Sequence, residues 1–127
     1  MHEAQVAAFA GSATVDTNLT TVFDSETALK ARGAFDVATI DVTNTGTNLN
    51  ALQLQIKGSS GGAWAALETA WTTVSAVLLS RSATIATLAT GAAATVQVKL
   101  NGAYAFRIQA STASSTSVVT VNGVARG

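Results

Sequence analysis

Few side chains in this sequence could take part in nucleophilic catalysis. His2 is the only histidine, and cysteine is absent from the 127 residues. A serine or threonine nucleophile needs a general base within hydrogen-bonding reach, and cysteine supplies thiolate nucleophiles and thiolate metal ligands. A serine triad, a cysteine nucleophile and a thiolate metal site are therefore not expected, and no disulfide can form.

Carboxylates offer the remaining route to acid–base chemistry. Glycosidases work with two carboxylates, and the sequence offers Asp24 with Glu26 and Asp36 with Asp41. Asp36 and Asp41 are five residues apart, so on a single strand they would point to opposite faces. We expect these carboxylates to end strands or to pair with nearby cations, and we expect the protein not to be an enzyme.

One turn carries several oxygen-bearing side chains that could bind calcium. Its candidates are Asp41, Asn44, Thr45 and Asn48, which surround Gly46. A calcium site needs several converging oxygen ligands, whereas Asx side chains commonly cap their own backbone in turns. Since there is only one carboxylate here, capping is the preferred interpretation, and we expect neither a metal nor a cofactor.

The two tryptophans are the main candidates for a binding surface. Trp64 and Trp71 could line a sugar platform, anchor a protein interface or lie in the core. Trp71 is the preferred exposed anchor. Leu49 joins the interface candidates because it is the one large residue in the polar loop at 44–50.

Arg107 is the fourth interface candidate. It lies between Phe106 and Ile108, so on a strand it faces away from the apolar side. We expect it to lie along a sheet face, paired with an acidic neighbour such as Asp41. A salt bridge between subunits is the alternative.

The elements that position these residues follow from alternation of apolar and polar side chains, which is typical of half-buried strands. Strands are predicted at 52–57, 96–100 and 104–109. The segments at 35–43 and 117–125 have apolar residues on both faces, which predicts central strands or strands carrying a bulge. Between two of them, Asn101 and Gly102 both tolerate positive φ and favour a type I′ turn. This pair predicts a tight hairpin joining 95–100 to 103–110.

Two segments allow more than one structure. From Trp64 to Leu78 the large apolar residues recur at spacings of three and four, as in a helix, but the β-branched residues and the preceding Gly-Gly favour a strand plus loop. Residues 24–33 could form a short helix with Asp24 or Ser25 as N-cap and Gly33 after its end, or an edge strand.

These elements predict an all-β protein: an antiparallel β-sandwich, jelly-roll-like, with about eight strands and room for one short helix. The length fits one domain, which we place at 22–127. Residues 1–21 are rich in small side chains, and we expect an extended N-terminal arm outside the core. The alternative is a first strand with Val6 and Phe9 inside the sandwich.

Composition excludes several classes of partner. Seven Lys+Arg balance seven Asp+Glu, and more than half of the chain is Ala, Thr, Ser or Gly. Nucleic-acid binding needs a basic surface, and a membrane span needs about 20 consecutive apolar residues; the sequence has neither. A neutral chain of small side chains is suited to close contact with copies of itself.

Several motifs resemble those of small virion proteins of tailed phages, over residues 35–127. They are Asp-Val-Thr-Asn-Thr-Gly at 41–46, Leu52 to Gly58 leading to Trp-Ala-Ala-Leu at 64–67, Leu-Ala-Thr-Gly at 88–91, and Ala-Phe-Arg-Ile-Gln-Ala at 105–110 before a final strand. That group consists of β-sandwich proteins encoded among head and tail genes, and it includes capsid decoration or cement proteins.

The resemblance implies a non-enzymatic virion protein, made in the host cytoplasm and located on the capsid surface. Its partners would be the phage major capsid protein and copies of itself, with a trimer preferred because capsid lattices present threefold positions. We expect the N-terminal arm and the loops at 44–50, 58–63 and 111–117 to make the contacts. The alternative is a carbohydrate-binding, tail, fibre or baseplate module.

Overall fold

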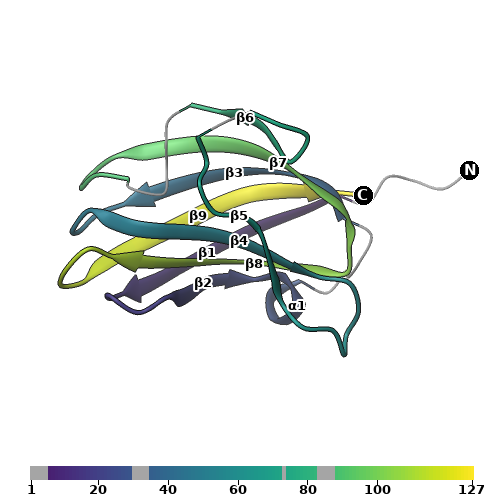
Figure 1. Ribbon diagram of the computed structural model, residues 1–127, viewed down its shortest axis with the longest axis horizontal. Helices are drawn as coiled ribbons and strands as arrows, with labels where there is room; N and C mark the ends of the chain where they lie inside the picture. Colours follow the sequence, from purple (N-terminus) through teal and green to yellow (C-terminus); the bar gives the residue numbers. More distant parts are fainter. Residues whose placement is uncertain (1–5, 30–34, 73, 83–87) are drawn as a thin grey trace, which may run out of the picture.

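The computed structural model describes residues 6–29, 35–72, 74–82 and 88–127, and this part of the chain contains nine strands and one short helix (Figure 1). In chain order these are β1 (Val6–Val15), β2 (Thr20–Asp24), α1 (Ser25–Ala28), β3 (Phe35–Asn44), β4 (Leu49–Lys57), β5 (Ala65–Glu68), β6 (Leu78–Arg81), β7 (Ala93–Ala103), β8 (Ala105–Thr112) and β9 (Ser117–Arg126).

The strands form two antiparallel sheets with the connectivity of a jelly roll. One sheet has the order β1-β9-β3-β7-β6, and the other has the order β2-β8-β4-β5. If the short edge strand β6 is left out and the other eight strands are renumbered 1 to 8 along the chain, the two sheets have the orders 1-8-3-6 and 2-7-4-5. This is the strand order of a jelly roll, in which the first strand pairs with the last. The prediction of an antiparallel β-sandwich of the jelly-roll type is confirmed.

The alternating segments form the strands that their patterns predict. On β4, Leu52 and Leu54 are buried between the sheets while Gln53 is half-buried on the other face. The segments with apolar residues on both faces became β3 and β9, and both have a strand on each side within their sheet. Both are therefore central strands, and β3 also carries the irregularity that the bulge alternative expects, a register shift against β7 between Phe35 and Val37. Beyond that shift, burial alternates along β3.

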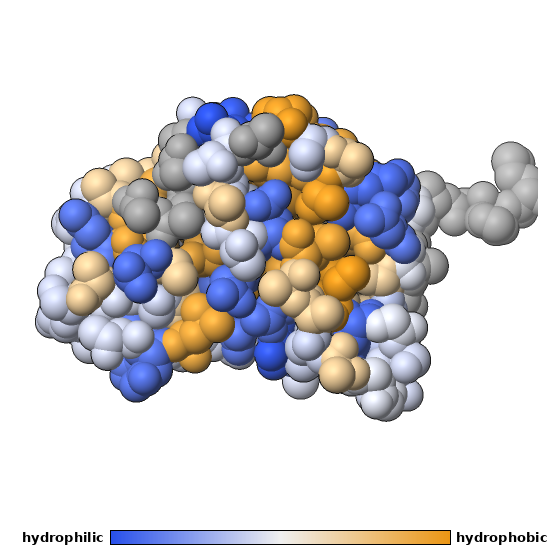
Figure 2. Space-filling model, in the orientation of Figure 1, coloured by the Kyte–Doolittle hydropathy of each residue, from blue (hydrophilic) through white to orange (hydrophobic). Residues whose placement is uncertain are grey.

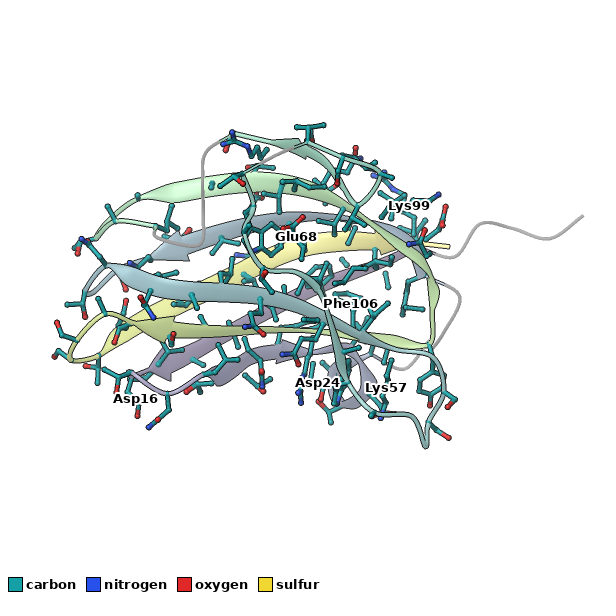
Figure 3. All side chains as sticks on the ribbon, viewed as in Figure 1. Asp16, Asp24, Lys57, Glu68, Lys99 and Phe106 are labelled. Carbon is teal, nitrogen blue, oxygen red and sulfur yellow. The ribbon has the colours of Figure 1, made fainter. Side chains whose placement is uncertain are left out.

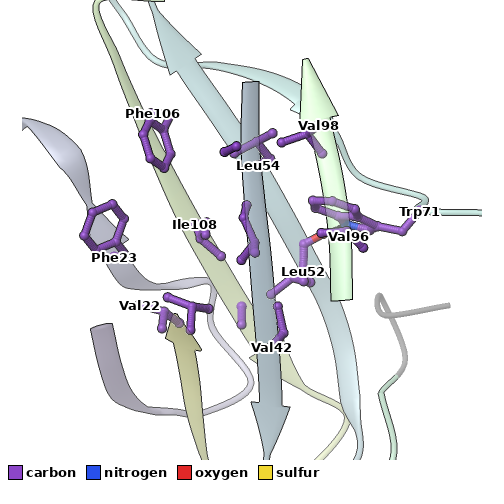
Figure 4. Packing of buried hydrophobic residues seen from close by; sticks show 14 of the residues in the cluster. Val22, Phe23, Val42, Leu52, Leu54, Trp71, Val96, Val98, Phe106 and Ile108 are labelled. Carbon is purple, nitrogen blue, oxygen red and sulfur yellow. Dashed lines mark hydrogen bonds between the residues drawn. The ribbon is translucent and has the colours of Figure 1, made fainter. Parts of the chain in front are cut away.

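All four phenylalanines of the chain lie in the core between the sheets, and Figure 4 shows Phe23 and Phe106 among them. The ring of Phe106 on β8 lies 5.4 Å from Phe9 on β1, 5.6 Å from Phe23 on β2 and 5.6 Å from Phe35 on β3, measured between centroids. Phe9 and Phe23 also stack at 4.6 Å. The cluster thus joins two strands of each sheet.

Phe9 has room only because its partner in the β1–β9 ladder is Gly123. A Cβ atom added at Gly123 would lie 2.6 Å from Cζ of Phe9 and would also collide with the carbonyl oxygen of Thr39 on β3. The absence of a side chain at this position lets the aromatic ring lie over the backbone of β9.

The hairpin predicted at Asn101 and Gly102 is wrong. Both residues do have positive φ, 55° and 72°, but β7 and β8 belong to different sheets. The pair lies within β7, between Lys99, which pairs with Val37, and Ala103, which pairs with Phe35. The register of β3 with β7 shifts between these two pairs, so β7 is irregular at Asn101 and Gly102. The left-handed pair therefore turns the chain at a corner of the sandwich.

The two ambiguous segments are resolved. Residues 64–78 contain β5 followed by a loop that leads into β6, so the strand-plus-loop prediction is confirmed. Helix α1 forms with Asp24 as N-cap, its carboxylate accepting from the N–H of Glu26 at 2.9 Å. The helix is only four residues long, and Gly33, predicted to follow its end, lies outside the described residues.

The prediction of an N-terminal arm outside the core is wrong for residues 6–15. They form β1, which pairs with β9 at every position from Val6 to Val15. Phe9 is buried, as the alternative expected, but Val6 is exposed. This segment of small residues lacks the hydrophobic periodicity that predicts a strand, and it is held in the sheet by its backbone pairing with β9. Residues 1–5 lie outside the described residues.

We predict that Phe106→Ala lowers the free energy of unfolding by about 3–5 kcal/mol, since it removes a fully buried ring from the centre of the core. Urea denaturation followed by circular dichroism measures the change. Val118→Ala, at an exposed position of β9, is the control and should change stability by less than about 0.5 kcal/mol. Equal effects of the two substitutions would contradict this description of the core.

Candidate functional site

Four connections meet at one end of the sandwich, which we call the Asn44 end: residues 16–19, 45–48, 89–92 and 113–116. Backbone hydrogen bonds join them to one another. The N–H of Thr112 donates to the carbonyl of Asp16 at 2.8 Å, that of Ala113 donates to Asn48 at 3.2 Å, and that of Gly91 donates to Asn44 at 2.7 Å. The loops therefore form one connected surface.

Asn44 is the fully buried polar residue at the centre of this end. Its amide nitrogen donates to the carbonyls of Thr47 at 2.8 Å and Leu88 at 2.9 Å, and its side-chain oxygen accepts a short hydrogen bond from the hydroxyl of Ser117. One side chain thus satisfies groups from three separate stretches of the chain. Buried polar groups satisfied in this way fix a single arrangement of the loops around them.

The calcium alternative is not supported by this geometry. Asn44 points into the protein, and Asn48 accepts from the backbone N–H of Thr90 at 3.1 Å. Asp41 accepts from the hydroxyl of Thr95 on the neighbouring strand β7. In the described parts of the chain, no three His, Cys, Asp or Glu side chains come together as a metal site.

Trp71 is buried, so the expectation that it is an exposed anchor is wrong. Leu49, the interface candidate from the loop at 44–50, is buried as well. Trp71 is 1% exposed, and its indole N–H donates to the carbonyl of Leu52 at 2.6 Å (Figure 4). It has a left-handed backbone, with φ of 58°, and the Glu68 carboxylate (Figure 3) accepts from its N–H at 3.0 Å. The ring closes the core beneath the β5–β6 connection.

Trp64 is half-buried on the outer face of the four-stranded sheet, in contact with two cations. The guanidinium carbon of Arg107 lies 4.6 Å from its ring centroid, and Nζ of Lys57 lies 5.1 Å away. Lys57 also pairs with Glu26 of α1 at 2.6 Å. These contacts hold the β4–β5 hairpin and α1 against the sheet.

Arg107 does not pair with Asp41, because β8 and β3 belong to different sheets. Its Nε donates to the side-chain oxygen of Gln55 on β4 at 2.6 Å, and its register partner on β2 is Asp24. The expectation that it lies along a sheet face is correct. The cations Lys57 and Arg107 beside Trp64 thus lie near two carboxylates, Glu26 and Asp24, and the four charges balance.

Sequence reasoning missed Lys57 and Asn44 as central residues. Lys57 follows the polar positions of its alternating strand, which indicates exposure, yet it is only 9% exposed because Trp64 and α1 cover it. Asn44 gave a local signal in its Asx-type turn, but the contact with Leu88 bridges 44 positions along the chain. Neither burial follows from local spacing.

On the face seen in Figure 2, hydrophobic side chains gather from the top edge towards the centre and right, with hydrophilic residues around and between them. The large apolar residues exposed in the described chain are Val6, Leu19, Val74 and Val118, on four different segments. No described helix has the length and apolar character needed to cross a bilayer.

Comparison with known proteins identifies the fold. No protein-family model matches the chain, and no curated protein matches it in sequence. Among solved structures it is similar to the crystal structure of the SPBc2 prophage-derived protein YomS. The likeness covers 100% of this chain and 97% of that one, with a TM-score of 0.57 and 12% sequence identity. The two proteins share the same fold over their whole length.

We predict that Asn44→Ala lowers the free energy of unfolding by about 1–3 kcal/mol, because it leaves buried partners of the amide unsatisfied. Thermal unfolding with and without added calcium measures this. Asn122→Ala, at an exposed position of β9, is the control and should have little effect. A calcium-dependent rise in Tm of the parent chain, lost in Asn44→Ala, would instead support a cation site at this end.

The two tryptophans should differ in acrylamide quenching. Trp64 is partly exposed and Trp71 is buried, so we predict that Trp64→Phe leaves a blue-shifted emission that acrylamide quenches weakly. The parent chain should contain an additional, readily quenched component. Strong quenching in Trp64→Phe would show that Trp71 is accessible and would contradict its burial.

Proposed function

We propose that this protein is a non-enzymatic structural protein of a phage virion, of the capsid decoration type, which binds the assembled shell. Two observations of different kinds support the proposal. The fold likeness to a prophage-derived protein extends over both chains, and the sequence motifs resemble those of tailed-phage virion proteins. The chemical character of the Asn44 end carries the argument further.

The Asn44 end is a fixed, nearly uncharged surface. Of the sixteen residues in its four loops, Asp16 is the only charged one, and most of the others are Thr, Ser, Asn, Ala or Gly. The loops are joined to one another by backbone hydrogen bonds, so little conformational entropy is lost when a partner binds. Such a surface offers hydroxyl and backbone groups for close contact with a folded protein.

One part of the predicted contact surface must be revised. The loops at 44–50 and 111–117 do meet at the Asn44 end, but the loop at 58–63 follows β4, which begins at that end and runs to the opposite one. We propose that the shell contacts the Asn44 end alone. Binding to a repeated lattice would stabilise the shell by mass action, because the decoration protein binds only its assembled form.

We predict that the purified protein co-sediments with undecorated capsids and that binding changes little between low salt and about half-molar salt, because few charges are involved. Ser114→Lys, at the Asn44 end, should weaken binding. Ala63→Lys, at an exposed position of the opposite end, is the matched control and should bind like the parent. Loss of binding in Ala63→Lys alone would place the contact at the other end.

A carbohydrate-binding role is the second candidate, and the partly exposed Trp64 beside Arg107 and Gln55 favours it. An aromatic ring bordered by polar side chains is a common setting for sugar recognition. Titration of tryptophan emission with host polysaccharides tests it, with Trp64→Phe as the variant that should not respond. A response in the parent chain, together with no co-sedimentation with capsids, would favour this role.

A further inference from the structure

The two sheets have four edge strands in the described chain, and three of them are short and irregular. β2 has five residues with a register shift between Thr21 and Phe23. β5 has four residues and a register shift against β4. β6 also has four residues, a register shift and the charged Arg81. Short length, bulges and charge at an edge are features that prevent edge-to-edge pairing.

β1, the fourth edge strand, has none of these features. It is ten residues long, its register with β9 is unbroken from Val6 to Val15, and its sequence contains no charged residue and no proline. Within the described chain, no strand pairs with the side of β1 that faces away from β9. That side is a regular row of backbone donors and acceptors open to another strand.

The core is also incompletely covered along β1. Of the inward-facing residues of β1, Phe9 and Val15 are buried, but the small residues Ala7, Gly11 and Ala13 are only half-buried. Their register partners on β9, Val119, Val121 and Ala125, are completely buried. β2 lies beneath β1 in the other sheet, with the carbonyl of Val22 close to Gly11. The described residues show no backbone hydrogen bond between the two strands.

We propose that β1 is an association edge for a second copy of this chain, whose own β1 pairs with it antiparallel about a twofold axis. An antiparallel pair of identical strands is self-complementary, as a twofold interface requires. The paired residues must point to the same face, so even-numbered positions face even-numbered ones. A register centred on Ala10 places Ala10 opposite itself and Ala8 opposite Ser12.

The side chains of β1 suit this occupant. In that register Phe9 faces Gly11 and Ala7 faces Ala13, so no two large residues oppose each other. No like charges meet either, because the strand has no charged residue. The two five-stranded sheets would join into one continuous sheet. The inference does not depend on the virion role, and it predicts a dimer where capsid symmetry favours a trimer.

Single-cysteine variants test the proposal, because the chain has no other cysteine. In the proposed dimer the two copies of residue 10 face each other at about 5 Å between Cα atoms, within disulfide range. Mild oxidation of Ala10→Cys should therefore give a disulfide-linked dimer. A mixture of Ala8→Cys and Ser12→Cys should cross-link between the two variants. Light scattering of the parent chain should give twice the monomer mass.

Asn122→Cys is the matched control. Asn122 is exposed and is the register partner of Ala10 on β9, and its two copies would lie about 14 Å apart, three strand spacings, which is beyond the reach of a disulfide. It should stay uncross-linked. A monomer or trimer mass for the parent chain, or cross-linking of Asn122→Cys as efficient as that of Ala10→Cys, would overturn the proposal. Capsid sedimentation tests the virion role separately.

Discussion

The contact of Phe106 with the other three phenylalanines is the interaction on which the arrangement of the two sheets depends. The four rings come from β1, β2, β3 and β8, so the cluster sets how the layers face each other. The backbone N–H of Phe106 also donates to the hydroxyl of the buried Ser25 at 2.9 Å. The short helix α1, which begins at Ser25, is therefore tied to the same residue as the core.

At the far end of the strands from α1, polar groups take over the role of the aromatic rings. Asn44 and Ser117 are buried there and bonded to each other, and the loops around them are composed mostly of small neutral residues. Small side chains alone would leave such loops with many conformations. The hydrogen bonds of the buried amide select one of these conformations, so a surface of small neutral residues acquires a definite shape.

The strands and fold class could be predicted from the sequence because their signal is local. The alternation of Leu52 and Leu54 with Gln53 is enough to give both the strand and its buried face. The candidate site was less predictable, since the burial of Trp71 and Lys57 depends on segments that pack over them from elsewhere in the chain. Asn101 and Gly102 show the same limit, because their backbone preference is local but the choice between a hairpin and a corner is not.

The position of β9 between β1 and β3 determines the order in which the five-stranded sheet can form. Until β9 has been synthesised, β1 has no hydrogen-bonding partner in its sheet, and β3 has only β7. Pairing of segments so far apart in sequence is slow, because loop-closure entropy is lost before the contacts form. The nascent chain therefore exposes the uncharged β1 segment until synthesis reaches β9, and aggregation competes with folding most strongly in that interval.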